Sequence, residues 1–249
     1  MSKRVQERRE AARIVREQLA REQRRKRTLW ISIGVVAVLV IGGMIGYAIY
    51  ASQKPTSFNT PAHANAEGTA IVTGSGKVSV DIYQDYLCPY CKQLHDSAGP
   101  TLAALAEQNK ITLNIHPIAI LDRSSTNQYS TRSAAAAGCA ADGGKFLAFN
   151  DALYANQPAE GGAGPTNEQL ITTGQGVGLT DSSFGNCVNA GTYMTWPEHT
   201  TDAASEKGVS GTPSVFVNGK KVTASLDAIT AAITAAGGDA SVAPTPSAS

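Results

Sequence analysis

The sequence has few of the side chains that bind metal ions, and most of them are widely spaced. Four histidines and four cysteines occur in 249 residues, and only Cys88 and Cys91 stand close together. A structural zinc site usually needs four ligands, but the chain has no second C-x-x-C and no H-x-x-x-H. His63, His116 and His199 are scattered along it. We therefore predict neither a metal site nor a bound cofactor.

Charged residues are also scarce, at 16% against 42% hydrophobic, which excludes a wholly disordered chain. Their distribution is uneven: residues 1–27 carry eleven Lys/Arg and four Glu, a net charge of +7, and the remainder has a net charge of −6. We interpret the basic segment as a topology signal lying near anionic lipid rather than as a nucleic-acid-binding surface.

Residues 29–50 contain no charged side chain at all. A helix of this length spans about 33 Å, which matches a hydrocarbon core of about 30 Å. Four basic residues, Arg24 to Arg27, precede the run, whereas only Lys54 follows it closely. The positive-inside rule then predicts a cytoplasmic N-terminus and an exported remainder. The alternative is a cleaved secretory signal, but the run is long for one and lacks an A-x-A site at its end.

These boundaries divide the chain into five parts. We expect a cytoplasmic segment (1–28), a transmembrane helix (29–50), a polar linker with two prolines (51–67), a folded domain (68–236) and a disordered tail (237–249). The sequence contains no internal repeat.

The pattern within the domain alternates between strands and helices. Strands are expected at "AIVTG", at "KVSVDIYQDY" with Val78, Val80 and Ile82 facing inward, and from Ile111. A helix begins near Cys88, and its Gly-Pro step at 99–100 predicts a kink or two stacked helices. An Ala-rich helical block covers about 124–207, and a strand, an Asn-Gly turn, a second strand and a final helix follow it.

The stretch "CPYC" places two thiols at the start of the expected helix. Unpaired N–H groups there stabilise a thiolate, and Pro89 suits the first helical position. Cys88 would then be the attacking thiolate, and Cys91, turned inward, would resolve the mixed disulfide. The alternatives are zinc ligation and an inert structural disulfide, although so short a loop stabilises poorly. His95 is interpreted as a helix-surface residue, with a part in tuning the thiol as the alternative.

Two segments carry a family resemblance: "YQDYLCPYC" (83–91) and "GVSGTPSVFVNGK" (208–220), with the helical block between them. Together they resemble the DsbA-type thiol–disulfide oxidoreductases of the thioredoxin superfamily, particularly the membrane-anchored or secreted actinobacterial type. The resemblance implies an α/β fold, a thioredoxin fold with an inserted helical domain, and a cis Pro213 beside Cys88. Thr212 would pair with an extended substrate chain. It also implies a structural Cys139–Cys187 disulfide, and a second redox-active pair is the alternative.

We therefore predict a membrane-tethered oxidase that inserts disulfides into exported proteins. By the resemblance, a membrane quinone reductase of the DsbB or vitamin K epoxide reductase type would reoxidise it. Pro89 and Tyr90 would tune the redox poise, although a Pro-Tyr dipeptide also occurs in glutaredoxins, which reduce. Reductive thioredoxins often hold a buried acid six residues before the first cysteine. Here that position is Ile82, and the absence of an evident buried base favours an oxidant.

Two rival functions remain open. The first is an extracytoplasmic thiol reductase or disulfide isomerase, which the redox potential would distinguish from an oxidase. The second is a membrane-tethered binding or chaperone module in which the C-x-x-C pair is incidental. This module would keep its full activity after a Cys88→Ser substitution.

Overall fold

The computed structural model describes residues 30, 34, 38–46 and 57–242. The chain divides into two units at Pro55, and the fold below is that of the second unit. In the first unit, residues 38–46 are helical. Among the described residues, no helix combines the length and the apolar character needed to cross a membrane. Much of the predicted span 29–50 and all of the predicted segment 1–28 lie outside the described residues.

A mixed five-stranded sheet forms the centre of the second unit. Its strand order is β1-β3-β2-β4-β5. The pair β2–β3 is parallel, and the other three neighbouring pairs are antiparallel. The strands are β1 (Ile71–Thr73), β2 (Val78–Gln84), β3 (Ile111–Pro117), β4 (Ser214–Val217) and β5 (Lys220–Val222). The alternation predicted for β2 is confirmed, because Val78, Val80 and Ile82 are all buried.

Three helices pack directly on this sheet. Helices α2 (Pro89–Glu107) and α7 (Trp196–Glu206) contact β3, and α8 (Leu226–Ala235) contacts β4. Helix α2 buries Leu94, Leu102 and Leu105 on one face. It continues through Pro100 as a single helix, so the predicted alternative of two stacked helices is wrong. Leu94 and Leu102 are buried before and after Pro100, and this packing offsets the loss of the backbone hydrogen bond that a proline cannot donate.

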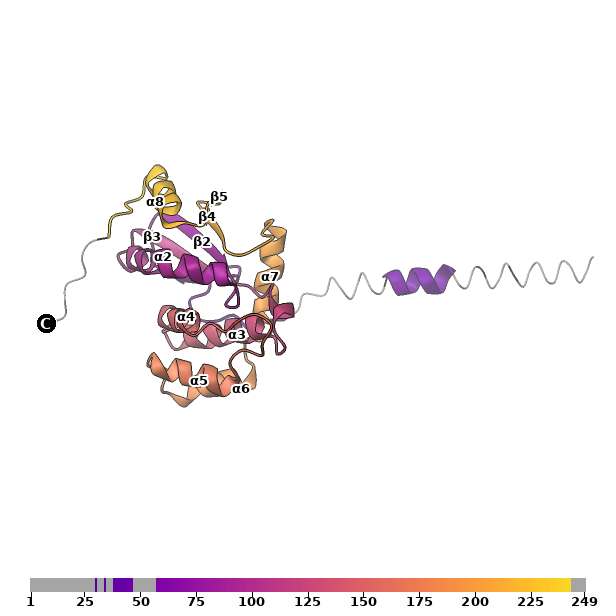
Figure 1. The fold of residues 1–249 in the computed structure, drawn as a ribbon. Helices are drawn as coiled ribbons and strands as arrows, with labels where there is room; N and C mark the ends of the chain where they lie inside the picture. Colours follow the sequence, from indigo (N-terminus) through magenta and orange to yellow (C-terminus); the bar gives the residue numbers. More distant parts are fainter. Residues whose placement is uncertain (1–29, 31–33, 35–37, 47–56, 243–249) are drawn as a thin grey trace, which may run out of the picture. The chain divides into compact units, whose positions relative to one another are not determined.

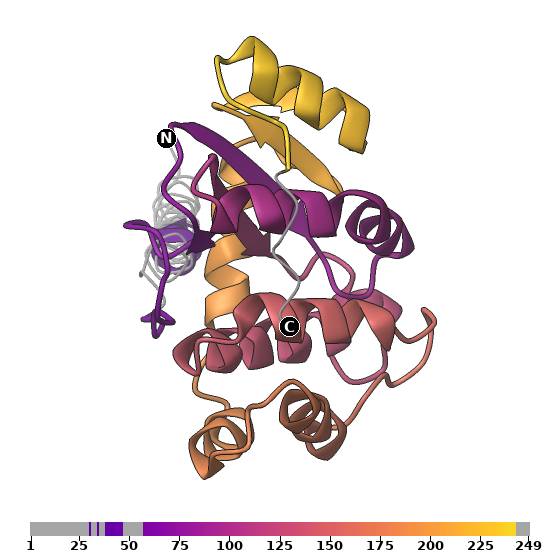
Figure 2. The same cartoon turned by 90° about the vertical axis from the view of Figure 1, so that its left-hand side faces the viewer.

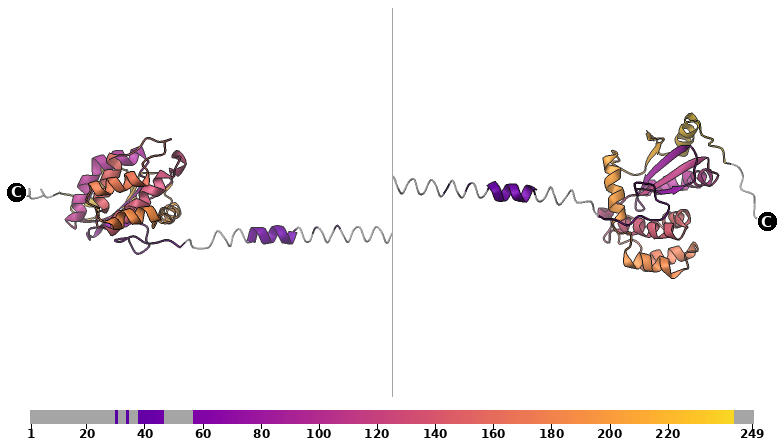
Figure 3. Two further views of the ribbon diagram at one scale, coloured as in Figure 1. Left: turned by 90° about the horizontal axis from the view of Figure 1, so that it is seen from below. Right: turned by 180° about the vertical axis from the view of Figure 1, so that it is seen from behind.

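Between β3 and β4 the chain forms a helical block. It begins with the short helix η1 (Asp122–Ser124) and continues through α3 (Tyr129–Asp142), α4 (Phe146–Ala155), α5 (Asn167–Gly176) and α6 (Ser182–Ala190) to α7. The Ala-rich helix α3 is buried almost all round, as expected for a helix in the centre of a core. Figures 1 and 2 show α2 between α8 and the helices α3 to α6, and α2 contacts both α8 and α4. Seen from behind, α7 runs alongside the sheet and reaches the helices α3 to α6 (Figure 3).

The end of the sheet follows the predicted turn chemistry. Asn218 and Gly219 adopt φ values of 46° and 76°, which form the tight turn between β4 and β5. The Ser225 hydroxyl caps α8 by accepting a hydrogen bond from the Ala228 N–H. The predicted hairpin and the predicted start of the last helix are therefore confirmed.

The segment 57–67, predicted as part of a polar linker, packs against the helical block. The Phe58 ring stacks on His199 with centroids 3.7 Å apart. The Asn59 amide donates to the Thr192 carbonyl at 2.8 Å, and the Ala62 N–H donates to Asp142 at 2.9 Å. The partners of these contacts lie 80 or more positions away in sequence, so local composition did not reveal them. This part of the predicted linker belongs to the folded unit.

The predicted disordered tail also begins with ordered contacts. Asp239 forms an ion pair with Lys110 at 2.6 Å, and the same lysine donates to the Ser241 carbonyl. Residues 237–242 therefore return to the end of α2 and the start of β3. Residues 243–249 lie outside the described residues.

Candidate active site

Cys88 lies where β2 passes into α2. A turn joins the two elements, and the Cys88 N–H donates to the Asp85 carbonyl at 3.0 Å. Cys88 is the N-cap of α2 in an extended conformation, and Pro89 occupies the first turn. The helix therefore presents its free N–H groups to the sulfur, as its sequence position predicts.

The environment of Cys88 favours its thiolate. A hydrogen bond from the Cys91 thiol and the backbone N–H groups of Cys91 and Tyr90 lower the pKa of Cys88 to about 6, although burial opposes this shift. Only 4% of Cys88 is exposed, so it is more covered than a position at a helix end suggested. At neutral pH the sulfur is largely ionised and can act as a nucleophile or as a leaving group.

Cys91 has the opposite character. It is 2% exposed, and burial together with the neighbouring Cys88 raises its pKa far above the ordinary thiol value. Both cysteines are free thiols in this structure. The two sulfurs of one C-x-x-C pair are therefore held in different protonation states, which is the asymmetry that thiol–disulfide exchange uses.

The loop before β4 closes the site on its other side. The Thr212–Pro213 peptide bond is cis, and the Thr212 carbonyl oxygen lies 3.4 Å from the Cys88 sulfur. Pro213 lines the same pocket as Cys91. The structure thus brings together two segments that are 124 positions apart in sequence.

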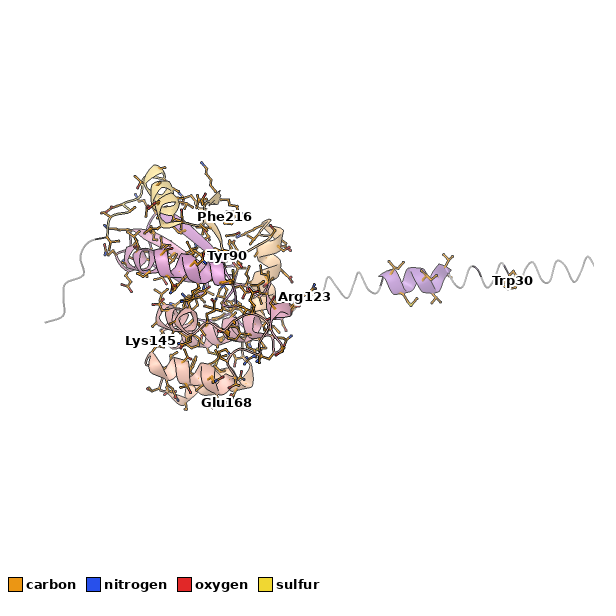
Figure 4. All side chains as sticks on the ribbon, viewed as in Figure 1. Trp30, Tyr90, Arg123, Lys145, Glu168 and Phe216 are labelled. Atoms are coloured by element: carbon orange, nitrogen blue, oxygen red, sulfur yellow. A yellow bond between two sulfur atoms is a disulfide. The ribbon has the colours of Figure 1, made fainter. Side chains whose placement is uncertain are left out.

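Pro89 and Tyr90 separate the two thiols along the first turn of α2. The Tyr90 side chain is 66% exposed, which is unusual for an aromatic ring, and Figure 4 shows it at the start of α2. An exposed ring beside a reactive sulfur offers apolar contact to a bound chain.

Asp85 is a buried carboxyl group that the sequence reasoning missed. It is fully buried, and its two oxygens accept hydrogen bonds from the Leu87 N–H, the Leu121 N–H and the Ser130 hydroxyl. Burial raises the pKa of Asp85 to about 6, and the Cys88 charge adds to the rise. The expectation that no buried base accompanies the thiols is therefore wrong. The available signal was an acidic residue in the stretch "YQDYLC", which has no other charged side chain.

His95 does not lie on the helix surface, and that interpretation is wrong. Its side chain is 15% exposed, and its ring stacks on Tyr154 of α4 with centroids 4.8 Å apart. Its Nε2 lies 3.3 Å from a carboxylate oxygen of Asp151. Helix α4, from the helical block, covers this face of α2, and the periodicity of α2 alone gave no sign of that contact.

Cys139 and Cys187 form a disulfide with an S–S distance of 2.02 Å. The bond joins α3 to α6 inside the helical block. Cys139 is buried in the core and Cys187 is partly buried against it, and neither belongs to the Cys88 site.

A family model described as Thioredoxin matches residues 66–235. The chain belongs to this thioredoxin family. Among solved structures, reduced DsbA from Mycobacterium tuberculosis is 32% identical with a TM-score of 0.61, and the match covers 69% of this chain and 94% of that one. The reduced disulfide bond oxidoreductase DsbG of the same organism is 33% identical with a TM-score of 0.62, covering 71% and 91%. The chain is therefore a DsbA-type protein disulfide oxidoreductase with a thioredoxin-like α/β fold.

More distant matches agree on the fold or cover less. Oxidised BdbD from Bacillus subtilis has a TM-score of 0.59 at 18% identity over 73% of this chain and 98% of that one, which is a likeness of fold. The serine/threonine-protein kinase PknE of Mycobacterium tuberculosis is 26% identical over 161 residues, or 60% of this chain. The match spans 28% of the length of that kinase.

Proposed function

We propose that this oxidoreductase inserts disulfides into proteins outside the cytoplasm, with Cys88 and Cys91 as its redox pair. The observation that carries the proposal is the contrast between the two sulfurs. The pKa of Cys88 is lowered to about 6, whereas that of Cys91 is raised. A stable Cys88 thiolate favours the reduced enzyme, and a C-x-x-C enzyme with a stable reduced form is an oxidant.

The reaction begins on the oxidised pair. A substrate thiolate attacks the Cys88 sulfur, the Cys88–Cys91 bond breaks, and its electron pair goes to Cys91, which takes up a proton. A second substrate thiolate then attacks the substrate sulfur of the mixed disulfide. Cys88 leaves as a thiolate, which its low pKa favours, and the substrate carries the new disulfide.

Neighbouring residues take supporting roles in this proposal. Tyr90 tunes the pair because its N–H faces the Cys88 sulfur, and Pro89 does so by fixing the backbone of the first turn of α2. Thr212 and the cis Pro213 border the site, and an extended substrate chain would pair with the backbone of Thr212. The disulfide Cys139–Cys187 lies outside the site and is assigned a structural role.

The cellular placement follows from the sequence. Residues 29–50 would anchor the chain in the cell membrane by a single helix, with residues 1–28 in the cytoplasm and the oxidoreductase domain (68–236) outside it. Reduced exported proteins are then the substrates. A membrane quinone reductase of the DsbB or vitamin K epoxide reductase type would reoxidise the pair.

The test is the equilibrium of the Cys88–Cys91 pair with glutathione, with Cys139 and Cys187 left intact. For an oxidase, the reduction potential of this pair is expected to lie above about −180 mV, between that of protein disulfide isomerase and those of the strongest oxidants. A value near about −270 mV, that of thioredoxin, would instead support a reductase. The buried Asp85 gives the reductase alternative a physical basis, because its negative charge destabilises the Cys88 thiolate.

A substitution separates both redox functions from a binding or chaperone module. Cys88→Ser is expected to abolish disulfide transfer to a reduced peptide while leaving the fold intact. Full activity of this variant would show that the pair is incidental.

A further inference from the structure

A small pocket lies behind the active-site helix, against Cys91. Its volume is about 30 Å³, which is room for about two water molecules. Most of its wall is apolar. The polar or titratable side chains that line it are Gln84, Cys91, His95, Asn150 and Asp151. A pocket with both a buried thiol and several polar groups on its wall is a suitable place for ordered water.

Four of these polar residues, Gln84, Asn150, His95 and Asp151, form one chain of hydrogen bonds that passes the pocket beside Cys91. The Gln84 amide donates to Asn150 Oδ1 at 2.5 Å, and the Tyr86 hydroxyl donates to the same oxygen at 3.0 Å. Two donors on this oxygen fix the orientation of the Asn150 amide. Its Nδ2 therefore faces His95 Nδ1, at 3.4 Å. Because His95 Nδ1 accepts a hydrogen bond from the Asn150 amide, it is the unprotonated nitrogen of the neutral ring.

The other ring nitrogen of His95, Nε2, contacts a solvent-exposed carboxylate. His95 Nε2 carries the proton and donates to Asp151 at 3.3 Å. The Asp151 side chain is 67% exposed, whereas that of His95 is 15% exposed. Gly99 leaves room for the ring, because a Cβ at that position would come within 2.9 Å of Nδ1. The chain of contacts therefore runs from the buried Gln84, past the Cys91 pocket, to the surface.

The charges around His95 suit a base at neutral pH. Burial lowers the pKa of His95, and the carboxylates of Asp151 and Asp96 oppose this shift, whereas Lys92 adds to it. Tyr154, from α4, stacks on the ring as a neutral phenol. Of the described residues that line the pocket, the titratable ones are Cys91, His95 and Asp151.

We propose that His95 exchanges a proton with Cys91 through water in this pocket, and that Asp151 orients the ring and passes the proton to solvent. The inference rests on the proposed role of Cys91 as the resolving thiol. When Cys91 attacks a mixed disulfide at Cys88, its proton goes to His95 Nδ1, the Cys91–Cys88 bond forms, and the bound thiol leaves as a thiolate. In the oxidising direction the proton returns to Cys91 when the bond breaks.

The experiment follows the reduced full-length protein reacting with dithiobis(nitrobenzoate) in stopped flow. In the first phase, the Cys88 thiolate attacks the reagent and releases one coloured thiolate. In the second phase, Cys91 attacks the mixed disulfide at Cys88 and releases the other. The variants are His95→Gln, which has no titrating ring, and Asp151→Asn at an exposed position. His63→Asn is the matched control, because His63 has φ 59°, which asparagine tolerates, and does not line the pocket.

His95→Gln is expected to slow the second phase at least tenfold, as general acid–base catalysis contributes roughly 10²- to 10⁴-fold. It should also remove the histidine step from the pH profile of that phase. Asp151→Asn is expected to slow the second phase less, and His63→Asn to leave both phases unchanged. The first phase should stay within about twofold in every variant, because Cys88 needs no base at neutral pH.

The outcomes separate this inference from the function on which it rests. A slow first phase in the wild-type protein would contradict the reactive Cys88, and with it the proposed function. A fast first phase with an unchanged second phase in both His95→Gln and Asp151→Asn would overturn the relay alone. Equal slowing of both phases would indicate a merely structural role and also overturn it. A second phase slowed by Asp85→Asn but not by His95→Gln would assign the base to Asp85 instead.

Discussion

Asp85 is the residue at which burial and charge conflict most clearly. Its carboxylate accepts three hydrogen bonds, and it has no cationic partner within the part of the chain that the structure describes. Its pKa rises from 3.8 to about 6. A raised folded-state pKa means that the folded protein binds the proton more tightly than the unfolded chain. This contribution to stability is complete below about pH 4 and is lost as the pH rises through about 6.

The Asp85→Asn variant tests this linkage. Between about pH 4 and 6 the free energy of unfolding of the wild-type protein should fall relative to that of the variant, by on the order of 2 kcal/mol. Denaturant titrations of both proteins across this range measure the difference. Parallel stability curves would contradict the shifted carboxyl. The same variant should lower the pKa of Cys88, because a negative charge near its thiolate is removed.

At this scale the sequence predicted the position of the two thiols at the start of α2 better than it predicted their surroundings. Cys88 and Cys91 followed from the C-x-x-C spacing and the helix start, both of which are local properties. Asp85 was missed and His95 was misjudged because each has a side-chain partner in the helical block. Ser130 lies 45 positions from Asp85, and Asn150 lies 55 from His95. Periodicity shows which way a side chain points along its own element, but not which distant element covers it.

At the scale of elements, one disulfide joins α3 to α6 within the helical block. It joins residues 48 positions apart. Replacing both Cys139 and Cys187 with alanine should lower the free energy of unfolding by about 4 kcal/mol, since the unfolded chain regains the entropy of an open loop. Denaturant unfolding of the oxidised protein and of the double variant gives this difference.

The same double variant also distinguishes a structural disulfide from a second redox pair. A structural bond predicts that the glutathione equilibrium of Cys88 and Cys91 is unchanged, because the bond lies within the α3–α6 core. Loss of disulfide transfer in a variant that is still folded would instead favour the redox-active alternative.

The ends of helices and strands were predictable where a single residue type determines the backbone conformation. The Asn218–Gly219 turn and the Ser225 cap follow directly from local chemistry, and both are observed. The course of α2 through Pro100 was not predictable in this way. Whether a proline ends a helix depends on the packing of the turns on either side, and here Leu94 and Leu102 are both buried.

At the scale of the whole molecule, the segment 57–67 connects the sequence-predicted anchor to the domain. Its contacts with the helical block involve Phe58, Asn59 and Ala62. This segment was predicted to be part of a linker because it is polar and contains Pro61. The composition of a segment indicates whether it can form a hydrophobic core of its own. It does not indicate whether the segment packs against the core of a neighbouring part of the chain.

The orientation across the membrane gives a prediction for intact cells. If residues 29–50 span the membrane with the basic segment inside, Cys88 faces the exterior. A membrane-impermeant maleimide should then label Cys88 in intact cells after mild reduction, and a Cys88→Ser, Cys91→Ser double variant should stay unlabelled. Labelling only after lysis would contradict the export of the domain.

The most direct test of the account is the ionisation of Cys88 in the reduced protein. The ultraviolet absorbance of the thiolate, followed against pH and compared with a Cys88→Ser variant, reports this one sulfur. The account predicts a midpoint near pH 6 and a rise in that midpoint when Cys91→Ala removes the hydrogen bond from its thiol. A midpoint near about 8.5, the value of an ordinary cysteine, would contradict it.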